Sequence, residues 1–262
     1  MPVRTALLAT ALATALSLAF PSTVVAQVIY DTPGRPYFET FDHPVLPTAQ
    51  ATPGILLDWI DNETFRGWSA AYYDGLKKVY DTPSHLMVSE GRSRTEVAFS
   101  LYRTETARSD GALGSQPSDQ RSPGVNSGGI FYGVSLINAT PAALTRLSLS
   151  YRVELYRLAA APNVSQSTLR VSYRVGGESL GEGTWIDLPE SDYTTPLENS
   201  GRAVGQNMDG NNAPHATSFA NITAPGLTLD PGQRLWLRWF DVNNSAVDHG
   251  IALDDVAITL LP

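Results

Sequence analysis

Strict alternation of apolar and polar side chains, repeated in three separate runs, is the feature that most constrains the fold. Every second residue is apolar from Leu147 to Leu155, from Leu169 to Val175 and from Leu235 to Trp239. A period of two places these side chains on one face of an extended strand. The opposite face is polar in the first two runs and carries Trp236 and Arg238 in the third, as in half-buried antiparallel strands. Because no long 3.6-residue periodicity follows Gln27, the chain is predicted to be all-β, with two packed sheets.

The first 26 residues have the pattern of a secretory signal. Arg4 precedes a short apolar run from Ala6 to Phe20, and Val24-Val25-Ala26 ends in a small residue. The remaining residues, 27–262, are enough for one large β domain. We therefore predict a signal peptide at 1–26, a single domain at 27–262, no membrane span, and a secreted or periplasmic location.

The charge and the cysteine content of the chain limit its expected partners and its expected sources of stability. The chain has 18 basic and 26 acidic side chains, a net charge of −8, and no cysteine. Nucleic acid is not an expected partner, because phosphate binding depends on an excess of Lys and Arg. Without disulfides, stability outside the cell must come from core burial or bound ions.

The second face of the three runs carries aromatic and charged side chains of the types that bind sugars. If the runs lie in one sheet, they make a single face whose aromatic rings stack on sugars while charged groups bond to hydroxyls. The alternative is an ordinary face of cross-strand Arg and Glu pairs. The predicted ligand-binding residues are Arg152, Glu154, Tyr156, Arg174, Trp236 and Arg238, flanked by Arg170 and Phe240.

An acidic loop joins the last two apolar runs, Leu235 to Val242 and Ile251 to Leu260, which have the pattern of neighbouring strands joined at a sheet end. Clustered carboxylates need a cation, a hydrogen-bond network or solvation. A structural calcium ion is therefore predicted, with a hydrogen-bond network as the alternative. The predicted metal ligands are Glu39, Asp241, Asp248, Asp254 and Asp255.

Catalytic motifs are few. The four histidines have no zinc-binding spacing, and no nucleophile elbow occurs. Two carboxylates suffice for glycoside cleavage, and Glu154 with Asp241 is the first pair to consider. Arg152, Glu154, Tyr156 and Arg238 have the residue types of a lyase site.

Several segments resemble the concanavalin-like jelly-roll modules of secreted bacterial proteins. They are FETF, WIDNETFRGW, SDGALGS, YGVSLINATPAALTRLSLSYRVELYR and LWLRWFDVNNSAVDHGIALDDVAITL. FE, GW and IALDD are also similar to elements of the MAM adhesion domain, although the paired cysteines of that domain are lacking. The resemblance implies a two-sheet antiparallel jelly-roll β-sandwich. It also implies a structural cation near Glu39 and Asp255, with Asp254 as a second candidate.

Three functions are compatible with these features. The leading hypothesis is a secreted, calcium-stabilised module that binds a polysaccharide or a cell-surface glycan. The alternative is a polysaccharide-degrading hydrolase or lyase on the same fold, and a third is a structural matrix protein. Fold alone does not decide among them.

Overall fold

The structure is a computed structural model of the 262-residue chain. It describes residues 27–43, 53–76, 82–92, 99–104, 107–117, 128–160, 165–196, 205–245 and 247–262. The predicted signal peptide, 1–26, lies outside the described residues.

Sheet A is built around β8 (Gly129–Asn138) and β15 (Arg234–Val242), which pair antiparallel along their lengths. Residues of these strands alternate between the core and the outer surface because successive side chains of a strand point to opposite faces. The other strands of sheet A are β1 (Val28–Tyr30), β4 (Trp68–Tyr73), β10 (Thr168–Val175), β11 (Ile186–Asp187) and β12 (Tyr193–Thr194).

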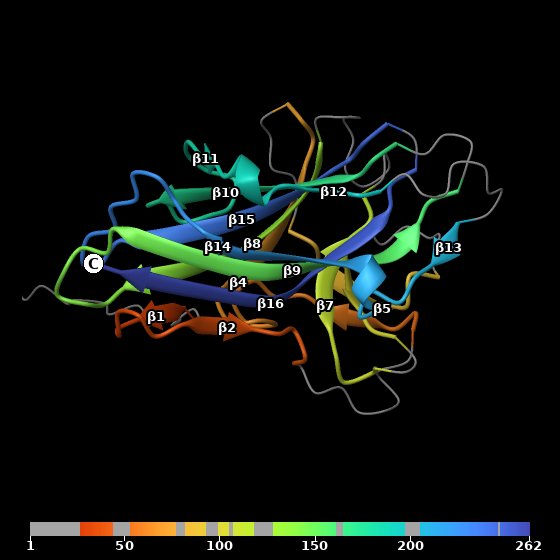
Figure 1. Ribbon diagram of the computed structural model, residues 1–262, viewed down its shortest axis with the longest axis horizontal. Helices are drawn as coiled ribbons and strands as arrows, with labels where there is room; N and C mark the ends of the chain where they lie inside the picture. The colour runs from red at the N-terminus through yellow and green to blue at the C-terminus, as the bar shows by residue number, and fades with distance from the viewer. Residues whose placement is uncertain are drawn as a thin grey trace, which may run out of the picture.

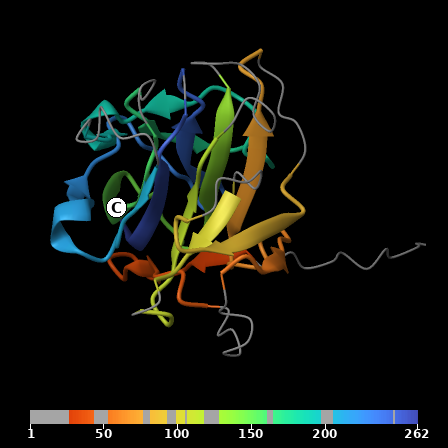
Figure 2. The same cartoon turned by 90° about the vertical axis from the view of Figure 1, so that its right-hand side faces the viewer.

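Sheet B is built around β9 (Arg146–Leu158) and β16 (Gly250–Leu261), the two longest strands. Its other strands are β2 (Tyr37–Glu39), β3 (Leu56–Asp58), β5 (His85–Ser89), β6 (Phe99–Tyr102), β7 (Ala112–Ser115), β13 (Gln206–Asn207) and β14 (Ala216–Ile222). Two short 3-10 turns, η1 (Pro189–Ser191) and η2 (Ala213–His215), interrupt the polar tract before β14. In Figures 1 and 2, β1 and β2 lie together along one side of the molecule.

The core lies between the two sheets. On β15 the inward side chains Leu235, Leu237 and Trp239 are fully buried. Trp239 stacks on Trp68 of β4 at 5.5 Å between ring centroids, and Tyr151 of β9 meets it edge-on at 5.5 Å. These contacts join the sheets, since Trp239 belongs to sheet A and Tyr151 to sheet B.

The predicted all-β, two-sheet sandwich is confirmed. The described residues contain strands and 3-10 turns but no α-helix, and none of their segments forms a helix able to cross a membrane. Most strand pairs are antiparallel, whereas β1 with β8 and β5 with β6 are parallel.

The three alternating strands do not lie in one sheet, which was the condition for a single binding face. β10 and β15 belong to sheet A, but β9 belongs to sheet B. Likewise β15 and β16 are not neighbours, because the acidic connection between them crosses from one sheet to the other. Alternation identifies the buried face of a strand, and it is the same for strands on either side of a shared core.

We expect Gly114→Ala to destabilise the fold. A Cβ on this β7 residue would lie 2.1 Å from the carbonyl oxygen of Ile251 and 2.5 Å from the Cα of Ala252. Both atoms belong to backbone, so the strands must move apart, at a cost of about 2 kcal/mol. Urea denaturation followed by tryptophan fluorescence measures the change.

Gly232→Ala is the control. No atom lies within 4 Å of its Cβ position, and only its φ of +80° opposes a side chain. It should cost about 1 kcal/mol. Equal losses in the two variants would contradict the close approach of β7 and β16.

Candidate functional site

Aromatic and arginine side chains gather on the outer side of sheet A. We call this group the aromatic face; its members are Tyr73, Phe131, Arg174, Trp185, Trp236, Arg238 and Phe240. The strand register produces it, because Phe131 pairs with Phe240 and Trp236 pairs with Arg174 across neighbouring strands. Tyr73 contacts both phenylalanines, at 5.0 Å from Phe131 and 5.7 Å from Phe240.

Arg238 forms the centre of the aromatic face. Its guanidinium carbon lies 3.8 Å from the ring centroid of Trp185 and 4.2 Å from that of Phe131. Such contacts are strongest where the cation is desolvated. Burial lowers the pKa of Arg238 to about 10, so the group stays charged at neutral pH.

The loop between β10 and β11 packs against this face and fixes Trp185. Arg174 donates hydrogen bonds to the carbonyl oxygens of Ser179, at 2.7 Å, and Glu182. The indole N–H of Trp185 also donates to Glu182 O, at 3.0 Å. The loop therefore holds the half-buried Trp185 ring in one orientation.

Leu180 of the same loop covers the middle of the sheet. It lies over Gly133, where an added Cβ would be 3.0 Å from a Leu180 methyl group. Leu180, Phe131 and Trp236 form a small apolar cluster on the outer side of sheet A. The aromatic face is thus packed against the sheet on one side and against Leu180 of the loop on the other. Its half-buried rings lie at the margin of this layer.

A hollow of about 310 Å³ with both apolar and polar lining adjoins the loop. Its floor includes Ala71 and Leu180, and its polar lining includes Asn62, Glu178 and Glu182. The buried Oδ1 of Asn62 accepts no hydrogen bond from the described residues. Hydrogen-bond acceptors beside aromatic rings are the groups that a sugar hydroxyl needs.

Three of the predicted ligand-binding residues lie elsewhere. Arg152, Glu154 and Tyr156 are on the outer side of sheet B, because β9 belongs to that sheet. Glu154 is fully buried, accepts a 2.7 Å hydrogen bond from the Tyr156 hydroxyl, and lies 3.1 Å from Arg152 Nε. The segment at Gly210 covers Tyr156 and Glu154, since a Cβ there would be 2.6 Å from the Tyr156 ring and 3.0 Å from the Glu154 Cβ, whereas Arg152 is partly exposed.

Arg174, Trp236 and Arg238 do come together on the aromatic face, with Phe240. The sequence also contained Trp185 and Tyr73, but these were not predicted to join them. No local signal could have placed Trp185 there, since the loop brings it back over the sheet. The hollow at Asn62 was missed for the same reason.

Asp241 and Asp248 lie at one end of the sandwich as part of a buried network. Asp241 continues the inward row of β15, is fully buried, and accepts a hydrogen bond from Ser115 of sheet B. Burial and the nearby Asp248 raise the pKa of Asp241 well above its usual value. Asp248 Oδ1 accepts from Ser167 Oγ at 3.3 Å and from Asn244 N at 3.1 Å.

The other three predicted metal ligands are divided between two sides of β16. Glu39 pairs with the inward-facing Val256 and accepts a 2.9 Å hydrogen bond from Phe41 N. Asp254 pairs with Arg152 on the outer side, and a bulge follows at Asp255, which has a φ of 51°. No three acidic or histidine side chains among the described residues are placed to hold a metal ion. The five carboxylates therefore do not form the single predicted site, and calcium binding stays a prediction.

The predicted hydrolase pair does not form an active site. Glu154 lies on the outer side of sheet B and Asp241 lies between the sheets, and both are fully buried. A glycosidic bond between them is impossible, since the paired carboxylates of a glycosidase must flank it. The predicted lyase residues are also separated, with Arg238 on sheet A and Arg152, Glu154 and Tyr156 on sheet B.

Comparisons with known proteins give only distant similarities. No family model matches the chain, and no curated protein matches it. One similar structure is the K1 cleaved adhesin domain of Lys-gingipain from Porphyromonas gingivalis W83. Its TM-score is 0.35 at 15% identity, over 86% of this chain and 98% of that one.

Two other structures have similarly low scores. A carbohydrate-binding module specific for non-crystalline cellulose, CBM28, has a TM-score of 0.34 at 11% identity, over 83% of this chain and 100% of that one. The enzymatically active domain of bacteriophage CBA120 tailspike protein 4 has a TM-score of 0.30 at 11% identity, over 78% of this chain and 21% of that one. Scores this low do not place the chain in a family.

We expect Asp254→Asn to flatten the dependence of stability on pH. Burial, Asp255 and Glu154 raise the pKa of Asp254 to about 9, against about 3.9 in an unfolded chain. The folded state then holds a proton that the unfolded state releases, so this contribution to stability is full below about pH 4 and is lost as pH rises toward 9. The slope from one such group is at most about 1.4 kcal/mol per pH unit.

Urea denaturation of the parent and of Asp254→Asn between pH 4 and 9 measures this slope. Asp230→Asn, an exposed change of the same charge, is the control and should leave the slope unchanged. Parallel profiles for the parent and Asp254→Asn would show that Asp254 is ionised in the folded protein.

Proposed function

We propose that this protein is a non-catalytic binding module that takes a neutral polysaccharide on the aromatic face of sheet A. The observation that carries the proposal is the orientation of Trp185. Its ring rests on Arg238 and Arg174, at 3.8 and 4.8 Å from the ring centroid, and its N–H is tied to Glu182 O. A ring held in this way loses little entropy when a sugar stacks on it.

The surroundings of Trp185 supply the polar part of the site. Asn62, Glu178 and Glu182 line the adjoining hollow, and Asp187 lies near Arg238. Oxygen acceptors bond to sugar hydroxyls, whereas aromatic rings contact the apolar faces of the sugar. A strip of rings with acceptors at its edge suits an extended, uncharged chain.

Catalysis has less support from the described residues. The carboxylates that the sequence offered for hydrolysis are buried apart, and Tyr156 is covered and bonded to Glu154. A concanavalin-like or MAM-like relationship, secretion and stabilisation by calcium remain predictions from the sequence. Melting in excess calcium and in chelator tests the last of these.

We expect Trp185→Ala to abolish retention on a neutral polysaccharide. Loss of one central stacking ring typically costs at least 2 kcal/mol in a binding site, or about thirtyfold in affinity. Affinity electrophoresis on a panel of neutral glucans, xylans and mannans measures retention. Reducing-end and unsaturated-product assays on the same mixtures should detect no products.

Leu56→Ala is the control, since Leu56 is a large exposed apolar residue of sheet B that belongs to neither the aromatic face nor its adjoining hollow. It should bind like the parent. Retention of Trp185→Ala equal to that of the parent would exclude the aromatic face, and product formation would show that the protein is an enzyme.

A further inference from the structure

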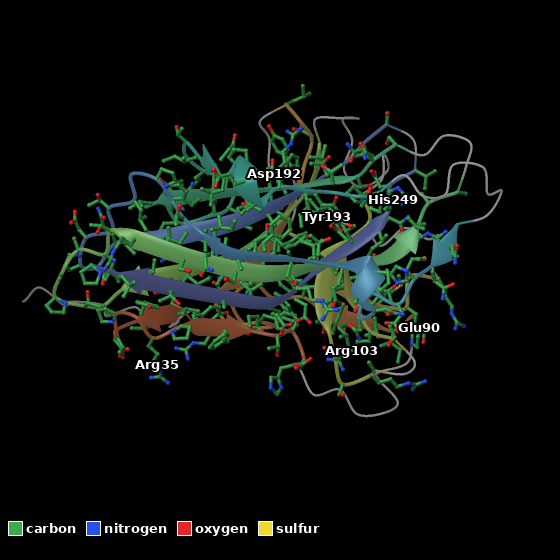
Figure 3. All side chains as sticks on the ribbon, viewed as in Figure 1. Arg35, Glu90, Arg103, Asp192, Tyr193 and His249 are labelled. Atoms are coloured by element: carbon green, nitrogen blue, oxygen red, sulfur yellow. The ribbon has the colours of Figure 1, made fainter. Side chains whose placement is uncertain are left out.

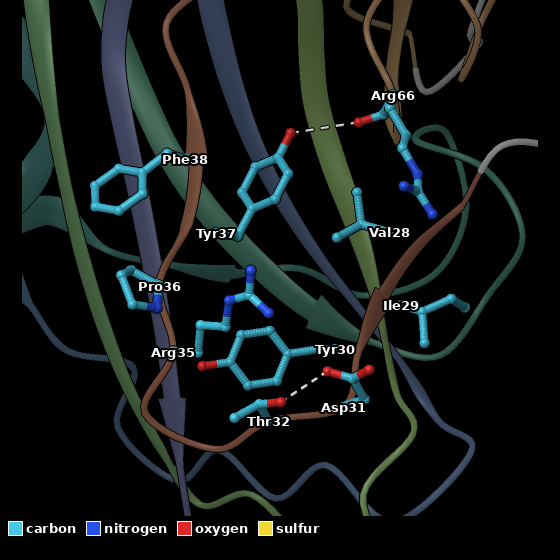
Figure 4. Close-up of a pocket in the computed structure, with 10 residues that line it drawn as sticks. All are labelled: Val28, Ile29, Tyr30, Asp31, Thr32, Arg35, Pro36, Tyr37, Phe38 and Arg66. Carbon is cyan, nitrogen blue, oxygen red and sulfur yellow. Dashed lines mark hydrogen bonds between the residues drawn. The ribbon is translucent and has the colours of Figure 1, made fainter.

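A second hollow lies at the edge of the sandwich, where β1 of sheet A runs beside β2 of sheet B (Figure 4). We call it the edge groove; it has a volume of about 450 Å³ and is lined by Val28, Ile29, Tyr30, Asp31, Thr32, Arg35, Pro36, Tyr37, Phe38 and Arg66. This size falls within the range of about 300–1,000 Å³ common to small-molecule sites. Figure 3 shows Arg35 and His249 toward opposite ends of the molecule, so the groove is remote from the buried acidic network.

The walls of the edge groove are rigid. The Tyr30 hydroxyl donates to Leu260 O at 3.1 Å and accepts from Leu260 N at 2.8 Å. The Tyr37 hydroxyl accepts from the Trp68 indole at 3.0 Å and donates to Arg66 O at 3.3 Å. Both rings are therefore fixed before any ligand arrives.

A tight turn places Arg35 at the groove. Arg35 N donates to Thr32 O at 3.2 Å, and Gly34 has the left-handed φ of +81° that the third residue of a type II turn requires. Pro33 is suited to the second position of such a turn. The Arg35 guanidinium has no hydrogen bond or ion pair within the described part of the chain, and it projects toward Tyr30 and Tyr37 (Figure 4).

Arg66 supplies a second cation. Its Nε donates to Gln27 O at 3.0 Å, which orients the guanidinium and leaves its two terminal nitrogens for a ligand. Asp31 is the groove's one acidic residue, and its carboxylate accepts from Thr32 at 2.9 Å. The groove is thus locally positive in a chain whose net charge is −8.

Apolar surface lies beside these cations. Phe38 is 65% exposed and Ile29 is 48% exposed, and both line the groove. A ligand that fits must carry a negative charge within a few ångströms of an apolar face. Arginine forks bind planar carboxylates in bidentate fashion, and two arginines against one aspartate match a single negative charge per ligand unit.

We propose that the edge groove binds uronic acid residues of an acidic polysaccharide. A uronate has one carboxylate attached to a sugar ring, so Arg35 holds the carboxylate while the ring lies against Tyr37 or Phe38. Arg66, on the other side of Tyr37 in Figure 4, adds positive charge to the groove. This site is separate from the aromatic face and does not depend on it. The negative charges of Glu182 and Asp187 at the rim of the aromatic face disfavour the same ligand there, whereas Glu178 is paired with Arg234.

The test compares oligogalacturonate with the same oligomer after reduction of its carboxyl groups. Isothermal titration should detect binding of the acidic form, weakened by salt, and little binding of the reduced form. Arg35→Gln should weaken binding of the acidic form about tenfold or more, because a charge-assisted hydrogen bond is lost. Arg66→Gln should act in the same direction.

Two control variants test whether uronate binding is specific to the edge groove. Arg108→Gln removes an exposed arginine elsewhere and should bind oligogalacturonate like the parent. Trp185→Ala should also keep its oligogalacturonate binding, although it loses neutral glycans. Circular dichroism and melting confirm that each variant is folded.

Several results would overturn the proposal. Equal binding of the reduced oligomer, or no effect of Arg35→Gln in a folded protein, removes the uronate site and leaves the aromatic face untouched. Equal binding of a poly-glutamate peptide or a sulfated glycan, with the same loss in Arg35→Gln, shows a general anion site. Conversely, uronate binding that depends on Arg35 without any retention on neutral glycans supports the groove and contradicts the function proposed for the aromatic face.

Discussion

The packing of Trp239 against Trp68 and Tyr151 is the contact on which the rest of the structure depends. It joins the two sheets through rings 5.5 Å apart and lies in the middle of the inward row of β15. Burial of these large rings contributes more to stability than any surface ion pair, since each removes some 150–250 Å² from water. With the core fixed on one side of β15, the other side of the same strand must present Trp236, Arg238 and Phe240 outward. The aromatic face therefore follows from the burial of the other side of β15 in the core.

The arginines on the outer side of sheet A separate the aromatic rings. Exposed aromatic rings in a row would favour aggregation, but Arg238 and Arg174 lie between the rings and keep the layer charged. The hydrogen bonds of Arg174 to Ser179 O and Glu182 O also attach the β10–β11 loop to the sheet, and Arg238 bonds to Ser172 of the neighbouring strand. The same side chains thus provide solubility, order in the loop and a support for Trp185.

Local patterns in the sequence were sufficient for the strands and the class of fold. The apolar positions from Leu147 to Leu155 and from Leu235 to Trp239 face the core on β9 and β15, although Glu154, Tyr156 and Trp236 on the opposite faces are buried as well. Membership of a sheet is different, because an inward row looks the same from either side of the core. That symmetry is why Arg152, Glu154 and Tyr156 were assigned to the face that holds Arg174, Trp236 and Arg238.

The carboxylates show a second limit of sequence patterns. Asp254 and Asp255 are adjacent in sequence, yet a bulge at Asp255 and the alternation of β16 set them apart from Glu39, which faces the other side. Carboxylates that are close together in the sequence therefore do not all lie close together in the structure. The edge groove is the opposite case, since Arg35 and Arg66 are distant in sequence and both line it. Hydrogen bonds to Gln27 and from Tyr37 hold Arg66 there. Of the features that form the edge groove, only the turn at Thr32–Arg35 has a pattern in the local sequence.

Charge distinguishes the two proposed surfaces. On the aromatic face Arg174 is buried, Arg238 is half-buried against the Trp185 ring, and Glu182 and Asp187 add negative charge at the rim, so this face suits a polyanion less well than the edge groove does. In the edge groove the cations are exposed and the rings lie beside them. A heteropolysaccharide with neutral and uronic acid stretches could occupy both surfaces of one molecule. Its second contact would then form at the high effective concentration set by the first, which raises avidity without any tighter single site. Neither a pure neutral glycan nor a pure polyuronate gains this advantage, so the spacing of the two surfaces would select mixed chains.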